Sequence, residues 1–187
     1  MTSTPSPHQI NTDTLTGQLT PIRKVVLAMG SNIGDREGNL VGAVMSLGDT
    51  PDLHIRDVSR VYECPAVDSV ANAPDFYNAV MVADSMLTPQ MLNERCHAIE
   101  AAYGRERPFP NAPRTLDIDL IVVGETVMDS EDLTLPHPRA QERAFVIVPW
   151  AEIDPHASIP GVGRLTEILG HLDTSGLRVV TGLDLQA

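Results

Sequence analysis

The sequence predicts an α+β fold: a single domain with one mixed or antiparallel sheet covered by helices. Three observations support this prediction. The chain has 187 residues, which matches roughly one domain at about 150 residues per domain. Segments with strand and helix patterns alternate along the chain, but without the regular strand–helix–strand rhythm of a wound parallel sheet. No segment of the chain repeats another.

Residues 1–21 are rich in Ser, Thr and Pro and show little periodic hydrophobicity, so we expect a disordered tail outside the core. The folded domain is expected over residues 22–187. Its first strand covers residues 22–29, IRKVVLAM, and ends in a turn-rich loop. Apolar residues at helical spacing then predict a helix over residues 37–47, which Gly48 ends.

The middle of the chain is predicted to hold two strands and a helix. The strands cover residues 53–62 and 76–83, with an irregular loop between them. Thr88 is the expected N-cap of the helix, because Pro89 follows it and suits the first helical position. Gly104 marks the expected end of this helix.

The remaining elements follow a proline-rich stretch. A strand is predicted over residues 115–123, and a short run near Val127 could pair with it. The later elements are, in chain order, the loop LTLPHPRA, a helix over 141–148, a turn at Asp154-Pro155, a short helix near Leu165 and a last strand over 177–183.

Charge and composition exclude several classes of function. The net charge of −12, from 13 basic and 25 acidic side chains, repels nucleic acid and acidic membranes from most of the surface. No apolar stretch approaches the roughly 18 to 20 residues of a membrane span, and no secretory signal is visible. Cys64 and Cys96 lack the spacing of a disulfide framework or a zinc site. We expect a cytoplasmic monomer that binds neither nucleic acid nor membranes.

The segment RTLDIDL, which begins at Arg114, is the strongest local chemical signal. Strand alternation places Asp117 and Asp119 on one face, with Cα atoms roughly 6.6 Å apart. Two parallel carboxylates at this separation repel each other unless a cation lies between them. Hard oxygen ligands of this kind suit Mg²⁺ that is shared with substrate phosphates. An ordinary strand with one solvated face would give the same alternation.

Arginines lie close to this pair of aspartates in the sequence. Arg105, Arg107 and Arg114 precede it. A guanidinium group binds phosphate oxygens bidentately, while a metal ion neutralises the remaining charge. Together these features favour a magnesium–nucleotide site, although a solvated basic loop would explain the arginines alone.

Two further segments offer groups suited to a binding site. In LTLPHPR, prolines on both sides hold His137 on an extended backbone, from which it could donate a hydrogen bond to a phosphate. Arg143 and Phe145 soon afterwards offer a cation and an aromatic face. Upstream, Phe76 and Asn78 could stack on a flat heterocycle and bind its edge, although plain strand packing explains this pair equally well.

Taken in order, these motifs resemble the 6-hydroxymethyl-7,8-dihydropterin pyrophosphokinase family over about residues 22–160. The resemblance rests on the GSN loop, a Tyr-x-x-Pro segment, PDFYNAV, a Glu-x-x-x-x-Arg-x-Arg helix end, PRTLDIDL and LTLPHPRAxxRAF. PRTLDIDL followed by LPHP is the most specific combination. The resemblance implies a ferredoxin-like α/β/α core in three layers with a mainly antiparallel sheet. It also implies transfer of pyrophosphate from ATP to the hydroxymethyl group of the pterin, releasing AMP, in folate biosynthesis.

The resemblance further implies roles for individual residues. Asp117 and Asp119 would hold two Mg²⁺ ions and, with Arg105 and Arg114, would be the catalytic residues; Asp117 is also a candidate proton acceptor. Residues on the ATP side would be Glu100, Arg107, Arg114, Leu120, Thr134, His137 and Arg143. The pterin pocket would be formed by Cys64, Pro65, Val67, Phe76, Asn78 and Phe145.

The chain departs from the family pattern at three places. Cys64 stands where Thr is common, so a backbone group would replace a side-chain hydrogen bond. His97 and Asp132 stand where Gln and Arg are frequent nucleotide contacts. The Arg-Trp pair that usually precedes Pro-Arg is absent. Phe109 is the only aromatic residue in that segment, and we expect it to replace the tryptophan as a lid over the pterin. The alternative is that Phe109 only anchors its loop.

Two other hypotheses fit part of these observations. A different Mg²⁺-dependent enzyme, such as a nucleotidyltransferase, would use the two aspartates without a pterin pocket and would release pyrophosphate instead of AMP. A non-catalytic, ferredoxin-like binding module would tolerate Asn or Ser at positions 117 and 119, and its ligand affinity would not need Mg²⁺.

Overall fold

The structure, a computed structural model, describes residues 10–12, 19–66, 73–105 and 112–185. Its main sheet consists of β3 (Arg23–Ser31), β4 (Leu53–Val58), β5 (Tyr62–Cys64), β6 (Phe76–Ser85), β7 (Asp117–Val123) and β12 (Arg178–Val179). The strand order is β12-β5-β6-β3-β7, with β4 also paired to β6. Every pair of neighbouring strands in it is antiparallel.

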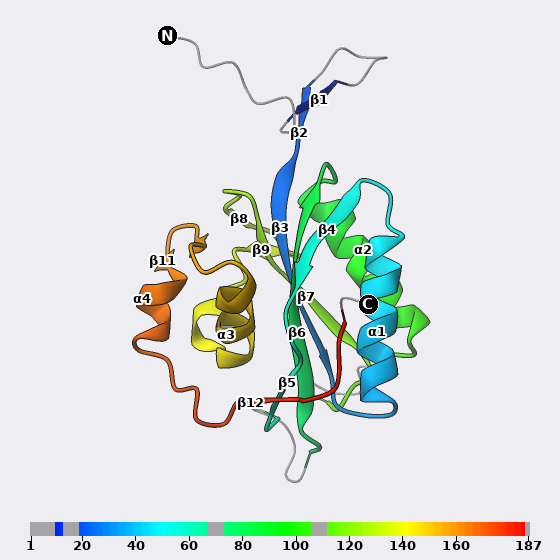
Figure 1. Ribbon diagram of the computed structural model, residues 1–187. Coiled ribbons are helices and arrows are strands. Elements are labelled where there is room, and N and C mark those ends of the chain that lie inside the picture. The colour runs from blue at the N-terminus through cyan, green and yellow to red at the C-terminus, as the bar shows by residue number, and fades with distance from the viewer. Residues whose placement is uncertain (1–9, 13–18, 67–72, 106–111, 186–187) are drawn as a thin grey trace.

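Helices cover both faces of this sheet (Figure 1). α1 (Arg36–Gly48) and α2 (Pro89–Ala102) lie on one face, and α3 (Ala144–Ile153) and α4 (Leu165–Leu169) lie on the other. The chain order β3-α1-β4-β6-α2-β7 with the strand order β7-β3-β6-β4 is the ferredoxin-like arrangement. The predicted α+β fold with three layers is therefore confirmed. The smaller elements are β1 (Ile10–Thr12), β2 (Leu19–Pro21), β8 (Met128–Asp129), β9 (Thr134–Leu135), the 3₁₀ helix η1 (Ala140–Glu142), β10 (Ser158–Ile159) and β11 (Gly163–Arg164).

Alternation along β3 divides the hydrophobic core into two layers. Val25, Leu27 and Met29 are buried in the cluster that contains α1 and α2 residues. Val26 and Ala28 are buried in the cluster that contains α3 residues. Because full burial of a Val or Leu side chain contributes about 1.5–3 kcal/mol, both faces of the sheet contribute to stability.

The caps of the first two helices explain where these helices begin. Asp35 accepts a hydrogen bond from the Gly38 N–H at the start of α1 (3.0 Å). Thr88 accepts one from the Met91 N–H at the start of α2 (3.2 Å), and Pro89 is the first residue of that helix, as predicted.

Two strand predictions were wrong. The strand expected over residues 53–62 is divided into β4 and β5, because Ser59 accepts the Val80 N–H (2.9 Å) through its side chain between them. The run near Val127 forms β8, which pairs with β9 and not with β7. The edge of β7 opposite β3 is occupied by groups that are not strands. Glu100 accepts the Ile118 N–H, and the Ile121 carbonyl accepts the His137 N–H.

The ends of the chain also differ from the prediction. The helix expected over 141–148 is a short 3₁₀ turn followed by α3, which continues to Ile153 with Pro149 inside it. The last strand is limited to Arg178–Val179. We expected no element in residues 1–21, but β1 pairs with β2 there. Residues 1–9 and 13–18 lie outside the described residues, so the disorder expected there stays a prediction. The domain boundary at residue 22 also stays a prediction.

Within the described ranges, no helix is long and apolar enough to cross a bilayer.

Candidate functional site

A cavity of about 370 Å³ lies over one end of the sheet, on the face toward α3. Its floor is formed where Gly30, Asn78 and Asp117 stand side by side on β3, β6 and β7. Small residues on β3, Ala28 and Gly30, leave this space open. A Cβ atom on Gly30 would lie 3.1 Å from Asn78 Oδ1, so a larger residue at position 30 would displace the Asn78 amide.

One end of the cavity, the neutral end, is lined by Cys64, Phe76, Asn78 and Phe145. Asn78 is 5% exposed, and its amide donates a hydrogen bond to Cys64 Sγ (3.2 Å). Burial raises the pKa of the Cys64 thiol to about 11, so the thiol is uncharged at neutral pH. The neutral end therefore presents two aromatic rings and an oriented amide without a net charge.

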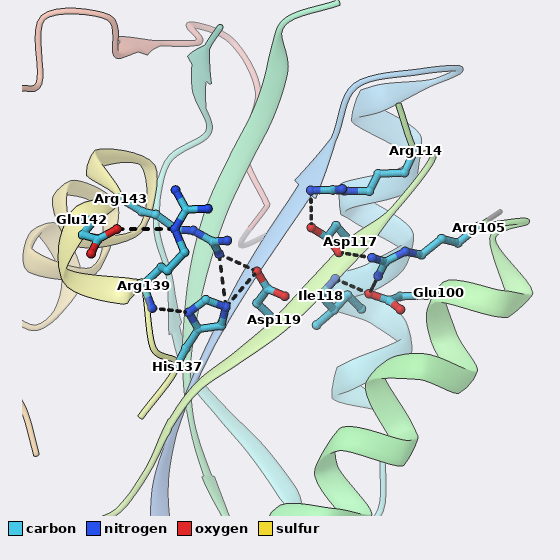
Figure 2. A network of polar contacts seen from close by, with 10 residues as sticks. All are labelled: Glu100, Arg105, Arg114, Asp117, Ile118, Asp119, His137, Arg139, Glu142 and Arg143. Atoms are coloured by element: carbon cyan, nitrogen blue, oxygen red, sulfur yellow. Dashed lines mark hydrogen bonds and ion pairs between the residues drawn. The ribbon is translucent and has the colours of Figure 1, made fainter. Parts of the chain in front are cut away.

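The other end, the charged end, is lined by Asp117, Asp119, Arg114 and Arg143, and Arg105 contacts Asp117 next to it (Figure 2). Asp117 Oδ1 lies 2.7 Å from Arg105 Nη2, and its Oδ2 lies 2.8 Å from Arg114 Nη2. The Asp117 side chain is only 14% exposed. Its charge is therefore balanced by the two guanidinium groups.

Asp119 contacts a different set of groups and is more open to solvent. Its Oδ2 lies 2.8 Å from Arg143 Nη1 and 3.9 Å from His137 Nε2, and its side chain is 33% exposed. Burial lowers the pKa of His137. His137 Nδ1 accepts the Arg139 backbone N–H (3.1 Å), so the neutral ring carries its proton on Nε2, the atom nearer Asp119. The cations beside both aspartates in this structure are thus arginine side chains.

Glu100, on α2, connects the charged end to the edge of β7. Its carboxylate accepts the Ile118 N–H (2.6 Å) and pairs with Arg105. Burial raises the pKa of Glu100, and the Ile118 N–H and Arg105 oppose this rise. Because Arg105 bridges Glu100 and Asp117, Glu100 fixes the guanidinium of Arg105 beside the cavity.

Asn32, in the loop after β3, is a positioning residue that the sequence analysis did not assign. Its Oδ1 accepts the Arg114 N–H (2.8 Å), and its own N–H donates to the Arg114 carbonyl (3.2 Å). Its amide also donates to the Pro74 carbonyl (3.1 Å). Asn32 therefore holds the backbone of Arg114 close to the start of β6. The GSN triplet directly after a strand was the only sequence signal for it.

The cavity brings together most of the predicted pterin and phosphate residues. Those that line it are Cys64, Pro65, Phe76, Asn78, Arg114, Asp117, Asp119, Arg143 and Phe145. Arg105 and His137 are not among the lining residues, but Arg105 pairs with Asp117 and His137 lies beside Asp119.

Two of the other predicted residues, Leu120 and Thr134, are described in the structure but are not part of the cavity lining. The Leu120 side chain is buried in the core toward α1 and α2. Thr134 donates a hydrogen bond to Asp129 Oδ1 (2.7 Å) beside the edge of the sheet. Three predicted residues lie outside the described residues: Val67, Arg107 and Phe109.

Further lining residues come from regions that the sequence analysis did not assign. Arg139 and Glu142 lie at or next to η1, and Asp173, Ser175, Gly176 and Leu177 follow α4. The motifs of the sequence end near residue 160, so no local pattern indicated that the C-terminal segment reaches the cavity.

The side chains of the charged end fit a metal ion shared with phosphate groups. Among the described residues, no group of three or more His, Cys, Asp or Glu side chains could hold a metal ion. Asp117 and Asp119 supply two carboxylates, and Mg²⁺ usually combines one or two carboxylates with waters and substrate phosphates. The Nε atoms of Arg105 and Arg114 are buried and have no hydrogen-bond partner in the described part of the chain. Such donors suit phosphate oxygens.

Comparison with known proteins identifies the family. The sequence model of the 7,8-dihydro-6-hydroxymethylpterin-pyrophosphokinase (HPPK) family matches residues 26–155, which is more than half of the chain. The chain belongs to this family. It is therefore an enzyme, a pyrophosphokinase, as the motifs implied.

Curated relatives agree with this assignment over most of their length. The chain is 41% identical over 157 residues to the 2-amino-4-hydroxy-6-hydroxymethyldihydropteridine pyrophosphokinase of Methylorubrum extorquens, covering 84% of this chain and 98% of the relative. It is 32% identical over 161 residues to the Pseudomonas aeruginosa protein of the same name, covering 86% and 99%.

Solved structures show the same fold. The wild-type HPPK-DHPS of Plasmodium falciparum with pterin and p-hydroxybenzoate matches with a TM-score of 0.60 and 12% identity. The match covers 83% of this chain and 44% of that one. An HPPK-DHPS in complex with substrates matches with a TM-score of 0.58, covering 80% and 43%. At this identity the likeness concerns the fold alone, and this chain spans less than half of those longer chains.

Proposed function

We propose that this pyrophosphokinase transfers pyrophosphate from ATP to the hydroxymethyl group of 6-hydroxymethyl-7,8-dihydropterin in folate biosynthesis, in a Mg²⁺-dependent reaction that releases AMP. One observation carries the proposal: a single cavity joins an uncharged end with Phe76, Asn78 and Phe145 to an end with two aspartates and three contacting arginines. A flat heterocycle suits the first end, and a polyphosphate with metal ions suits the second.

At the charged end, Asp117 and Asp119 are the proposed ligands of two Mg²⁺ ions, whose chemistry is to neutralise charge on the transferred phosphates. Transfer of this kind depends mainly on in-line positioning and charge neutralisation. The arginines that now balance the aspartates would then bind phosphate oxygens, with Arg107 as a further contact. Glu100 would keep Arg105 in place, because the two side chains form an ion pair in a buried position.

Two arginines also contact aromatic residues of the neutral end. Arg114 Cζ lies 5.2 Å from the centroid of the Phe76 ring, and Arg143 Cζ lies 5.6 Å from that of Phe145. Arginines that move toward phosphate oxygens would therefore change the surroundings of both rings. This contact supports coupled binding of the nucleotide and the pterin.

At the neutral end, Asn78 would bind the edge of the pterin ring, and Phe76 and Phe145 would stack on it. Cys64, Pro65 and Val67 would complete this pocket, and Phe109 would close over the ring. The nucleotide side would include Leu120, Thr134 and His137. We further propose that the protein acts as a cytoplasmic monomer, in keeping with its two free cysteines, Cys64 and Cys96.

Product analysis tests the proposed function. The purified chain is incubated with ATP, Mg²⁺ and 6-hydroxymethyl-7,8-dihydropterin, and each component is omitted in turn. We expect AMP only when all three are present. Release of pyrophosphate would instead indicate a nucleotidyltransferase. Binding of an ATP analogue without any Mg²⁺ requirement, together with no product, would indicate a non-catalytic binding module.

A further inference from the structure

The C-terminal segment 173–185, here called the C-terminal strap, crosses the edge of the sheet and connects its two faces (Figure 1). Leu172, just before the strap, packs against the apolar cluster that contains α3 residues. Leu183 and Leu185, near its end, pack against the cluster that contains α1 and α2 residues, and Leu185 is 6% exposed. Because both ends of the strap are anchored by apolar contacts, its middle is held over the sheet edge.

The middle of the strap forms a turn at the mouth of the cavity. The Asp173 carboxylate accepts the Ser175 N–H (2.9 Å), and the Leu177 N–H donates to the Thr174 carbonyl (3.0 Å). This turn places Gly176 and its neighbours in the cavity lining. A Cβ atom added to Gly176 would lie 3.7 Å from Pro65 Cδ, so a side chain at position 176 would be in van der Waals contact with the neutral end.

Beyond the turn, the strap extends the sheet along β5. Arg178 lies opposite Glu63 and Val179 opposite Tyr62 in the antiparallel pair β12–β5. The Val180 N–H continues this pairing by donating to the Val61 carbonyl (2.9 Å). Since β5 ends at Cys64, the strap supports the strand that brings Cys64 to the cavity.

Arg178 also pairs with two acidic residues that directly precede lining residues. Its Nη2 lies 3.7 Å from Glu63 Oε2 and 3.5 Å from Asp75 Oδ2. Glu63 precedes Cys64, and Asp75 precedes Phe76. Arg36 bonds the same two residues, through Glu63 Oε1 (3.1 Å) and the Asp75 carbonyl (2.8 Å). The two strands of the neutral end are thus linked through Glu63 and Asp75.

Ion pairs this exposed contribute little to global stability. The Arg178 side chain is 69% exposed, and exposed pairs contribute about 0.2–1 kcal/mol. An effect of Arg178 on catalysis would therefore arise from the placement of Cys64 and Phe76 and not from unfolding.

We propose that the C-terminal strap forms a wall of the pterin end of the cavity, and that Arg178 is a positioning residue for Cys64 and Phe76. The inference rests on the proposed function and extends the substrate site to residues 173–178. The match to the family ends at residue 155, so the family pattern does not cover this part of the site. The wall would discriminate between flat bicyclic rings by the space that Gly176 leaves beside Pro65.

Two strap variants and one matched control test this role. Gly176→Leu adds a side chain toward Pro65 at a position whose φ lies outside the left-handed region. Arg178→Ala removes the ion pairs of Arg178 with Glu63 and Asp75. Arg56→Ala is the control, because Arg56 is also exposed (58%) and pairs with Asp84 on β6, whereas neither residue lines the cavity.

We expect Gly176→Leu to raise the KM for the pterin about tenfold, and Arg178→Ala to raise it about threefold. The KM for ATP and the Tm should stay close to those of the wild type. Arg178→Lys should restore part of the pterin KM, since it keeps the positive charge. Arg56→Ala should leave both KM values unchanged.

Wild-type AMP formation is measured first, so that the two proposals can fail separately. If the wild type forms no pterin-dependent AMP, the proposed function is wrong, and the role of the strap falls with it. If the wild type is active but both strap variants keep the pterin KM of the control, only the role of the strap is overturned. A lower Tm with an unchanged pterin KM would likewise reduce the strap to a structural element.

Discussion

The two ends of the cavity are held in place by different forces. At the neutral end, Cys64, Phe76 and Asn78 lie on paired strands, so backbone hydrogen bonds fix their positions. At the charged end, Arg105 and Arg143 come from separate connecting segments and are held against the aspartates by ion pairs. The comparison indicates that the neutral end is preformed for a ring. The charged end is expected to exchange its present ion pairs for contacts with phosphates and metal ions.

The largest expected effect is at the charged end. Asp117→Ala and Asp119→Ala should each lower kcat more than 100-fold, because metal-mediated charge neutralisation contributes several kcal/mol to sites of this kind. Asp117→Ala should also lower the Tm more than Asp119→Ala does. Asp117 is the more buried of the two and pairs with two guanidinium groups. Its loss would remove its ion pair with Arg114 and leave Arg105 with Glu100 as its carboxylate partner.

Kinetics and thermal unfolding of both variants check this prediction, with Asp84→Ala as the acidic control because Asp84 pairs with Arg56 outside the cavity. Either aspartate variant keeping more than about a tenth of the wild-type kcat, equivalent to roughly 1.4 kcal/mol, would contradict the metal assignment.

A smaller and more selective effect is expected at the neutral end. Asn78→Ala should raise the KM for the pterin about 10- to 100-fold and leave the KM for ATP unchanged, because a buried hydrogen-bonding group for the ring edge is lost. Steady-state kinetics with each substrate varied in turn measures both constants. Asn93→Ala, on the outer surface of α2, is the matched control. If Asn78→Ala raised the KM for the pterin and the KM for ATP equally, the prediction that the neutral end binds only the pterin would be wrong.

The coupling between the two ends is expected to be moderate. A pterin analogue should bind about tenfold more tightly when an ATP analogue and Mg²⁺ are present. The nucleotide phosphates would attract the guanidinium groups of Arg114 and Arg143, which contact Phe76 and Phe145. Calorimetric titration with and without the nucleotide measures the change. The same pterin affinity in both titrations would mean that the ends act independently.

The smallest effect concerns Cys64. Since burial raises the pKa of its thiol to about 11, the thiol stays protonated between pH 7 and 9. Iodoacetamide, which reacts with the thiolate, should therefore modify Cys64 at pH 8 only after the protein is unfolded. Mass spectrometry of native and urea-treated samples measures this. Rapid labelling of native Cys64 would place a thiolate in the end that we describe as uncharged.

Local sequence patterns predicted the elements that have strong end signals. Thr88-Pro89 marked the start of α2, and the alternation around Asp117 and Asp119 placed both carboxylates on the cavity face. Prediction failed where an element depends on its neighbours. The divided strand β4–β5 reflects hydrogen bonds between Ser59 and Val80. The pairing of β8 with β9 reflects an edge of β7 that is already occupied by groups from α2 and the His137 segment.

The sequence by itself determined the fold class, the family and about half of the residues that line the cavity, because motifs such as PRTLDIDL keep the relevant side chains within a few residues of each other. Only the tertiary structure decided which cations balance Asp117, that Asn32 holds Arg114, and that the C-terminal strap reaches Pro65. Apart from the Asp117–Arg114 pair, these contacts join residues far apart in the chain. Their formation depends on packing and on the pairing of strand edges, which no local periodicity encodes.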